Sequence, residues 1–332
     1  MNQNQLALKY FLMFSISIAY IFIYSTFPSY WFRDRVNYVE IAKNSGEMID
    51  YHFSQYDILF HEPIFLYINK ILLLFINPQY IPNFFVFFIT SSLVFFLFKK
   101  ANNFTLFLLG ILSLIVVPFL FHMQLVVLRQ ALATVLFILI LFYGRKEINI
   151  LIFLGLLPLV HASFALIFVI YFMYVVLNRR FSNIFYLSVF ISLFLFLFFN
   201  FAMLVATYLG FYQIGYIKNY ELDVSGGAFV FFIFIFISLL YVCRNQRNKI
   251  NDLAIIFTAI YLLLYFVTPL IGRYMVTFFP FILLSLVERS KIENYAILVV
   301  LIVIYSIVSY NGAIFENSLL ISSFSEMNWR GE

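Results

Sequence analysis

Long apolar runs cover most of this 332-residue chain, and their length restricts what it can fold into. A helix needs about 20 apolar residues to cross the hydrocarbon core of a bilayer. Runs such as 84–98 and 229–243 contain no charged residue, and hydrophobic residues make up 64% of the chain against 11% charged ones. Nearly the whole chain therefore has to lie in the membrane, and the sequence predicts an all-α polytopic integral membrane protein.

Hydropathy separates eleven expected membrane spans. They cover residues 8–27, 80–98, 104–121, 125–143, 148–159, 162–177, 184–204, 227–243, 253–271, 274–287 and 295–314. A further stretch, 62–76, is interrupted by Asn69 and Lys70, which favours a helix lying at the outer membrane face rather than crossing. The sequence predicts a single membrane domain over 1–332 with about eleven transmembrane helices and one interfacial helix.

The orientation follows from the basic residues, because short loops rich in Lys and Arg face the cytoplasm. Six clusters lie at segment ends: Lys9, Lys99-Lys100, Arg145-Lys146, Arg179-Arg180, Arg244/Arg247/Lys249 and Arg289/Lys291. All six fall on one side only if 62–76 does not span. This predicts an N-terminus inside, a C-terminus outside, and periplasmic segments at 28–79, 205–227 and 315–332.

Several classes of chemistry leave no trace in the sequence. Cys243 is the only cysteine, so no internal disulfide is expected, and no Cys/His spacing indicates a zinc site. No Walker loop, GxGxxG, HExxH or GxSxG motif is present. The net charge of +5 is distributed as a topology signal and does not form a nucleic-acid-binding patch. We therefore expect no metal, cofactor or nucleic-acid partner, and a substrate that is already activated.

Two arginines near the outer ends of spans are the first candidates for function, because ionised side chains in a membrane are costly. Arg129, next to Gln130, follows an apolar run and needs a carboxylate, a phosphate or water as its partner. Arg273 follows a break between apolar runs, and its neighbour Tyr274 can stack on a sugar ring. Both arginines are expected to clamp an anion. The alternatives are a structural salt bridge from Arg129 to Asp34 or Glu62, and an interfacial anchor for Arg273.

The first outer segment supplies a second group of candidates. Arg33, Asp34 and Arg35 place guanidinium groups beside a carboxylate just above the membrane, where they can hold a phosphate or a sugar. Glu62 precedes Pro63, a residue favoured in the first helical turn, so Glu62 is either a helix cap, a catalytic base or both. The alternative for Arg33 and Asp34 is anchoring at the interface.

Two histidines complete the set of candidate residues. His161 lies between two short apolar runs that suggest a tightly turned hairpin reaching the outer surface, and His122 lies near a similar break. Histidine can donate a hydrogen bond to a phosphate oxygen or transfer a proton near neutral pH. The alternative for both is a hydrogen-bonded structural histidine.

Four short motifs in order carry a resemblance to a known family. FRDRVNY (32–38), HEPIF (61–65), VLRQALA (127–133) and LVHASFAL (159–166) are followed by an arginine between late apolar segments. This order resembles the EpsG-like and Wzy-type polysaccharide polymerases of bacterial membranes. Many relatives show a Gly-x-Asp-Tyr pattern in the first outer loop, where this chain has Arg35-Val36-Asn37-Tyr38. Asn37 cannot act as a base, so that role passes to Asp34 or Glu62.

The resemblance implies a fold similar to GT-C-like lipid-linked glycosyltransferases and a glycosyl transfer at the periplasmic face of the bacterial inner membrane. A growing glycan leaves undecaprenyl pyrophosphate and joins an incoming lipid-linked repeat unit. A chain-length regulator protein is the implied partner. The implied pyrophosphate and glycan ligands are Arg129, Arg273, Arg33, Arg35, His122, Gln130 and Tyr274, and the implied catalytic residues are Glu62, Asp34 and His161.

Three other functions fit parts of the sequence. A flippase for lipid-linked oligosaccharides would place cations along a cavity reaching both membrane faces, whereas the candidates here crowd one face. An O-acetyltransferase would need a reactive His or Ser on the cytoplasmic side. An O-antigen ligase shares almost all the chemistry of the polymerase and stays open beside it.

Overall fold

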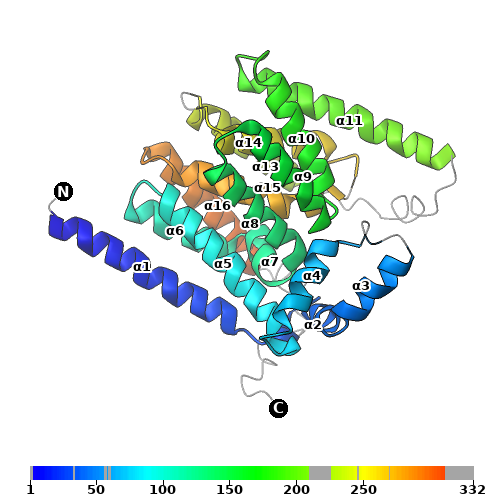
Figure 1. Cartoon of the computed structure of the whole chain (residues 1–332). Helices are drawn as coiled ribbons and strands as arrows, with labels where there is room; N and C mark the ends of the chain where they lie inside the picture. The colour runs from blue at the N-terminus through cyan, green and yellow to red at the C-terminus, as the bar shows by residue number, and fades with distance from the viewer. Residues whose placement is uncertain are drawn as a thin grey trace. The chain divides into compact units, whose positions relative to one another are not determined.

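The computed structural model describes residues 3–32, 34–55, 58, 61–208, 226–244, 247–268 and 270–310 (Figure 1). The described residues form helices and no strands, which confirms the all-α prediction. They divide into two compact units: unit 1 comprises Met1–Ala165 and Val287–Glu332, and unit 2 comprises Leu166–Leu286. Arg33, most of 205–227 and the tail at 315–332 lie outside the described residues.

Unit 1 holds the first half of the chain together with the last described helix. Its elements are α1 (Gln3–Thr26), η1 (Ser29–Trp31), α2 (Arg35–Lys43), α3 (Ser45–Ser54), α4 (Pro63–Leu72), η3 (Pro78–Tyr80), α5 (Ile81–Lys100), α6 (Phe104–Val116), α7 (Pro118–Leu125), α8 (Leu128–Tyr143), α9 (Glu147–Leu156), η4 (Leu157–Leu159) and α16 (Ile292–Tyr310).

The centre of unit 1 is α5, which packs against α1, α2, α6, α7 and α8 (Figure 1). Its apolar residues face several directions, which suits a helix surrounded by other helices and by lipid. Phe85, Ile89 and Phe96 are fully buried. Its neighbour α8 is also buried along most of its length and carries Arg129 in its first turn. The core of α5 and α8 thus supports the segment that presents this arginine.

The expected span 104–121 is broken in the structure. Helices α6 and α7 meet at an angle of 72°, because Val117 precedes Pro118 and takes an extended conformation. The Leu114 carbonyl loses its helical partner at the break, because Pro118 has no N–H, and the buried side chain of Gln124 reaches it. Its amide donates to the carbonyls of Leu114 at 3.0 Å and Leu120 at 2.9 Å. The bend is therefore a stable feature that directs α7 toward the start of α8.

Unit 2 contains most of α10 (Phe164–Leu177), with α11 (Ile184–Tyr208), α13 (Gly226–Val242), α14 (Lys249–Leu264) and α15 (Leu270–Val287). Helix α14 packs against both α11 and α13 and is buried on almost every side. Asp252, near its start, accepts hydrogen bonds from Tyr174 at 3.0 Å and from Arg247 at 3.0 Å. Its charge is therefore paired, which suits a structural role in holding α10 to α14.

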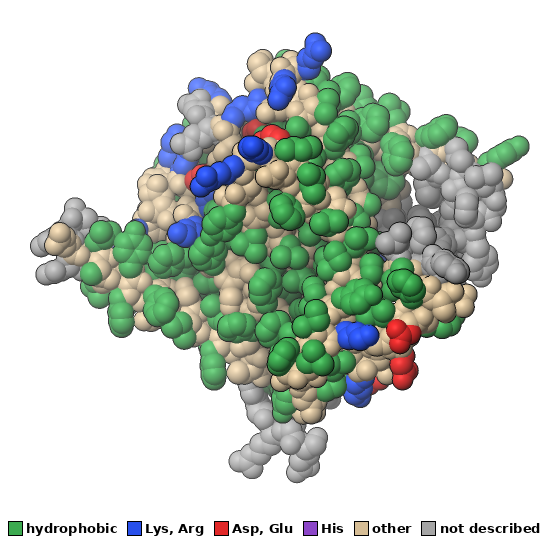
Figure 2. Space-filling view, viewed as in Figure 1, with side chains coloured by type: hydrophobic (Ala, Val, Ile, Leu, Met, Phe, Trp, Pro, Cys, Tyr) green, Lys and Arg blue, Asp and Glu red, His purple; other side chains and the backbone are tan. Residues whose placement is uncertain are grey.

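The surface and helix lengths agree with a polytopic membrane protein. Among the described helices, three stretches are long and apolar enough to cross a bilayer alone, and the bent pair α6–α7 makes a fourth if counted as one span. Large hydrophobic side chains such as Phe75 and Phe201 are exposed, and hydrophobic side chains dominate the face seen in Figure 2. Each expected span coincides with at least one helix. Eleven crossings, the N-inside orientation and the single domain stay predictions.

Candidate functional site

The candidate site is built around Glu62, which lies at the start of α4. Its backbone has φ 53° and ψ 55°, in the left-handed region, and only Asp34 shares a positive φ among the described non-glycine residues. Such a conformation costs about 1–3 kcal/mol and is found most often at functional sites. The Glu62 side chain makes no hydrogen bond that caps α4. Its carboxylate instead bonds to residues from two other parts of unit 1.

Both carboxylate oxygens of Glu62 are engaged. Oε2 accepts a hydrogen bond from Arg129 Nη1 at 2.5 Å, and Oε1 lies 2.5 Å from His161 Nδ1. The backbone N–H of Ala162 also donates to Oε1, at 3.2 Å. These partners lie 67, 99 and 100 residues away along the chain. The fold therefore brings together the HEPIF, VLRQALA and LVHASFAL motifs, and we call Glu62, Arg129 and His161 the charged triad.

The surroundings of Glu62 favour its ionised form. Burial of the carboxyl works against ionisation, but the hydrogen bond from His161 and the positive charge of Arg129 outweigh it, so the pKa of Glu62 lies below its ordinary value. An ionised carboxylate can only accept hydrogen bonds, so His161 Nδ1 has to carry a hydrogen toward it. In the tautomer with its hydrogen on Nδ1, Nε2 is the ring nitrogen that carries the lone pair.

Arg129 is held by aromatic rings as well as by its ion pair. Its guanidinium carbon lies 5.8 Å from the centre of the Tyr38 ring and 6.0 Å from that of Phe65. Stacking of this kind stabilises a cation and fixes the plane of its donors. The side chain is still 38% exposed, so part of the guanidinium can meet a ligand. The salt bridge to Glu62, one of the alternatives open from the sequence, is present.

Tyr38 and Phe65 belong to the FRDRVNY and HEPIF motifs, but the sequence did not indicate their contact with Arg129. A signal was available in each motif, since Tyr38 follows Arg35 by one helical turn and Phe65 follows Glu62 by three residues. Apolar and aromatic residues are so common in this chain, at 22% aromatic, that neither stood out.

A small cavity of about 210 Å³ opens beside the charged triad. It is lined by Ile41, Met48, His61, Glu62, Phe65, Leu66 and Arg129. The ring of His61 stacks on that of His52, with the ring centres 3.6 Å apart. A cavity with a carboxylate, a guanidinium and imidazole on apolar walls can bind a polar group and orient it. No three His, Cys, Asp or Glu side chains converge as metal ligands within the described part of the chain.

The other expected site residues lie in different settings. Asp34 is exposed at the start of α2, and Arg35 is fully buried. His122 is half-buried in α7, and Gln130 is buried in α8 next to Arg129. None of these four is hydrogen-bonded to Glu62 in the contacts described here. Their roles as substrate or catalytic residues stay predictions.

Arg273 and Tyr274 belong to unit 2, in the first turns of α15. The expected span 274–287 begins four residues earlier, at Leu270, so Arg273 is helical and does not lie in a break between two helices. Arg273 is exposed, and the Tyr274 ring packs on Phe278 at 6.0 Å between centres. Their part in binding an anion or a sugar stays a prediction, as does that of Arg33, which lies outside the described residues.

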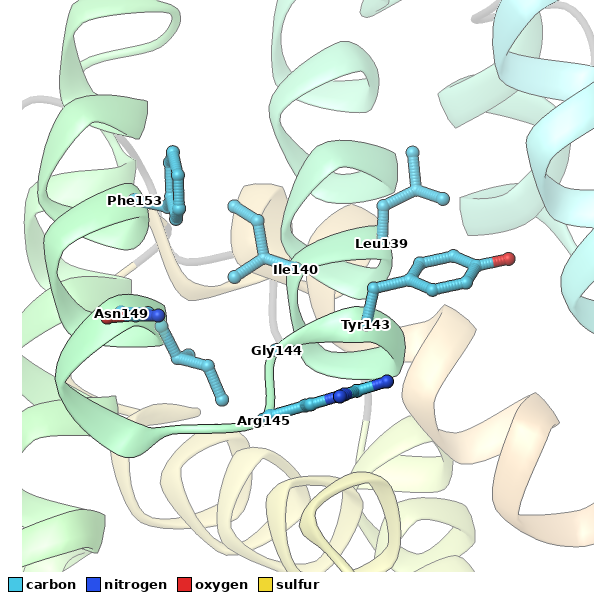
Figure 3. A pocket seen from close by; sticks show the side chains of 8 residues that line it. Leu139, Ile140, Tyr143, Gly144, Arg145, Asn149 and Phe153 are labelled. Carbon is cyan, nitrogen blue, oxygen red and sulfur yellow. The ribbon is translucent and has the colours of Figure 1, made fainter.

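A second, larger cavity of about 490 Å³ lies at the far end of α8 from Arg129. Figure 3 shows side chains of α8 and α9 around it, with Ile140 and Phe153 facing each other and Arg145 at the connecting turn. Gly144 makes this turn possible, because a Cβ atom there would lie 2.4 Å from Ile150 Cγ1. The walls are mainly apolar and carry no carboxylate or histidine, so this cavity lacks the groups for proton transfer.

A Glu62→Gln variant tests the ionisation of the charged triad. Because folding lowers the pKa of Glu62, its ion pairs stabilise the protein above the unfolded pKa, ordinarily 4.5, and this contribution is lost as pH falls through the lower folded pKa. We expect the free energy of unfolding of wild type to exceed that of Glu62→Gln by about 2 kcal/mol at pH 7. Thermal unfolding in detergent between pH 7 and pH 4 should show this gap shrinking below about pH 4.5. A gap independent of pH would contradict an ionised Glu62.

All three residues of the charged triad lie within the part of the chain that matches a protein-family model. The model of the EpsG family matches residues 8–324, nearly the entire chain. No curated protein and no solved structure matches the chain significantly. The four ordered motifs, the polytopic helical architecture and the family match agree, and the family supports a membrane polysaccharide polymerase in general terms. This chain belongs to the EpsG family.

Proposed function

We propose that this protein polymerises a surface polysaccharide at the periplasmic face of the bacterial inner membrane. The growing glycan, linked to undecaprenyl pyrophosphate, is transferred onto an incoming lipid-linked repeat unit. The observation that carries the proposal is the charged triad, in which Glu62 joins Arg129 and His161 at 2.5 Å each. The family match supports a polymerase in general, and the triad supplies the two functions that this transfer needs, a base and an anion clamp.

In the proposed reaction, a hydroxyl of the incoming repeat unit attacks the anomeric carbon of the growing glycan. A bond forms between that oxygen and carbon, and the bond from the same carbon to the pyrophosphate oxygen breaks. The hydroxyl proton passes to His161 Nε2, and the bonding electron pair leaves with the lipid pyrophosphate. The activated donor provides the driving force, so the reaction needs no nucleotide and no redox cofactor.

Glu62 takes the role of orienting His161 in this mechanism. Its carboxylate is bonded on both oxygens and has a lowered pKa, which makes it a weak base. Its hydrogen bond to Nδ1 fixes the ring orientation and stabilises the imidazolium that forms when Nε2 accepts a proton. Of the expected catalytic residues, we therefore assign proton transfer to His161 and positioning to Glu62.

Arg129 neutralises the departing pyrophosphate. One of its terminal nitrogens is committed to Glu62, while the side chain remains partly exposed at the edge of the small cavity. A guanidinium offers five N–H donors, so it can hold Glu62 and phosphate oxygens together. Negative charge grows on the pyrophosphate during bond breaking, and donors already in place stabilise that transition state.

Deleting the gene in its host is the direct test of this function. We expect electrophoresis of the surface glycan to show the long-chain ladder lost and a single repeat unit retained, because the repeat unit is still made and exported. Expression of the intact gene in trans should restore the ladder. Loss of every repeat from the surface would contradict polymerisation and indicate transport or ligation instead.

A further inference from the structure

Arg35 is a fully buried arginine in the first turn of α2, and none of the ion pairs described for the chain involves it. It was expected to bind pyrophosphate or glycan, but its side chain donates to two backbone carbonyls. Nε donates to Leu125 at 3.0 Å and Nη1 to Phe27 at 3.1 Å. A side chain with no exposed surface cannot touch a large lipid-linked substrate in this conformation.

The two carbonyls lie at the ends of two helices. Leu125 is the last residue of α7, and Phe27 directly follows α1, which ends at Thr26. Helix C-termini carry a partial negative charge from unpaired carbonyl groups, and a cation there is stabilised. The Phe32 ring adds a cation–π contact, with its centre 4.8 Å from the guanidinium carbon.

These contacts give the Arg35 guanidinium two hydrogen bonds and an aromatic ring in place of a carboxylate partner, while Nη2 has no hydrogen-bond partner. Burial lowers the pKa of Arg35 to about 9, which leaves the guanidinium protonated at neutral pH. Removing a buried charge or hydrogen-bond donor leaves its partners unsatisfied, so the site is sensitive to substitution. The Leu125 and Phe27 carbonyls are the groups that would be left.

The carbonyl of Leu125 belongs to the turn that delivers Arg129. After Leu125, Val126 and Val127 both donate their N–H groups to the His122 carbonyl, and α8 then starts at Leu128. Val127, the N-cap position of α8, has no side chain able to cap the helix. The tether from Arg35 is therefore a side-chain contact that fixes the end of α7, four residues before Arg129.

We propose that Arg35 is a positioning residue for the glycosyl transfer: it locks the α7–α8 turn and thereby sets where the Arg129 guanidinium meets the pyrophosphate. This inference rests on the proposed function. It assigns Arg35 no contact with substrate, so its loss should slow the reaction without weakening substrate binding. Displacement of a catalytic group by about 1 Å can cost about 10²-fold in rate.

The test compares Arg35→Lys with wild type in proteoliposomes supplied with lipid-linked repeat unit. Lysine keeps the charge but cannot reproduce the two-pronged contact with both carbonyls. We expect kcat to fall by about 10²-fold, with KM unchanged within about twofold. The kcat of Arg35→Ala is expected to fall further than that of Arg35→Lys, and guanidinium added to the assay should restore part of the activity of Arg35→Ala. If the alanine variant does not fold, Arg35→Lys carries the test.

Asn83→Ala is the matched control. Asn83 also donates to the Phe27 carbonyl, at 3.3 Å, and to the Ser25 carbonyl, at 2.9 Å, but makes no hydrogen bond to Leu125. The substitution Asn83→Ala therefore removes contacts at the end of α1 and leaves the contact between Arg35 and the α7–α8 turn in place. We expect kcat of Asn83→Ala to stay within about twofold of wild type, whereas a fall matching that of Arg35→Lys would overturn the assignment to the turn.

Hydrogen exchange followed by mass spectrometry supplies a readout that does not depend on activity. Backbone amides over 122–130 should exchange faster in Arg35→Lys than in wild type or Asn83→Ala, because the turn opens more often. A raised KM with unchanged exchange would overturn the proposal and return Arg35 to substrate binding. Unchanged kcat and exchange would leave it a passive buried residue. If wild type makes no polymer, the proposed function fails, while exchange still reports on the tether.

Discussion

Replacing His161 with alanine is expected to lower the rate of polymer formation by about 10²–10⁴-fold, the range that a positioned acid–base group contributes. The imidazole Nε2 is the proton acceptor that the charged triad offers, since Glu62 is ionised with a lowered pKa and bonded on both oxygens. Without Nε2, the attacking hydroxyl has to lose its proton to water. The measurement is the initial rate in proteoliposomes with purified lipid-linked repeat unit.

Two further variants sharpen this result. His161→Gln can keep a hydrogen bond to Glu62 but has no basic nitrogen, so it should fold like wild type and be as slow as the alanine variant. Asn200→Ala is the control, because Asn200 is exposed and its side chain donates to the Phe196 carbonyl of its own helix, α11. A His161→Gln enzyme with wild-type rate would assign proton transfer elsewhere, with Glu62 or Asp34 next to be tested.

Replacing Arg129 with alanine should abolish long-chain polymer, with a fall of about 10²–10³-fold in rate, as seen when one donor to a developing anion is removed. Arg129→Lys keeps a positive charge but lacks the planar fork that holds Glu62 and phosphate oxygens together, so it should recover only part of the activity. Electrophoresis of the surface glycan reports chain length, and fluorescence-detected size exclusion reports whether the protein remains folded.

Arg145→Ala provides the control for Arg129. Arg145 lies at the other end of α8, is exposed and takes part in none of the salt bridges described. Its loss removes the same charge from the chain without touching the charged triad, so we expect a normal ladder. Normal chain lengths in the Arg129→Ala strain, at wild-type protein level, would refute the pyrophosphate clamp.

Much of the fold was predictable because hydropathy is a local property of the chain. Each expected span coincides with a helix, and the 62–76 stretch contains helix α4, whose place at the outer membrane face stays a prediction. The bend at Val117 was not predicted, although Pro118 follows it directly. A proline is compatible with a helix start or a kink, and only packing around Gln124 decides between them.

The sequence by itself determined that this chain is a membrane protein and which segments form helices. It also determined that Glu62, Arg129 and His161 are polar residues beside apolar segments. Only the tertiary structure decided that these three meet, across 67 and 99 residues, and that Arg35 in the same motif set turns inward to two helix ends. The physical reason is that apolar periodicity acts over one helix, whereas the pairing of buried charges depends on which helices pack together. A charged side chain in an apolar segment needs a partner, but which residue is that partner depends on how the chain folds.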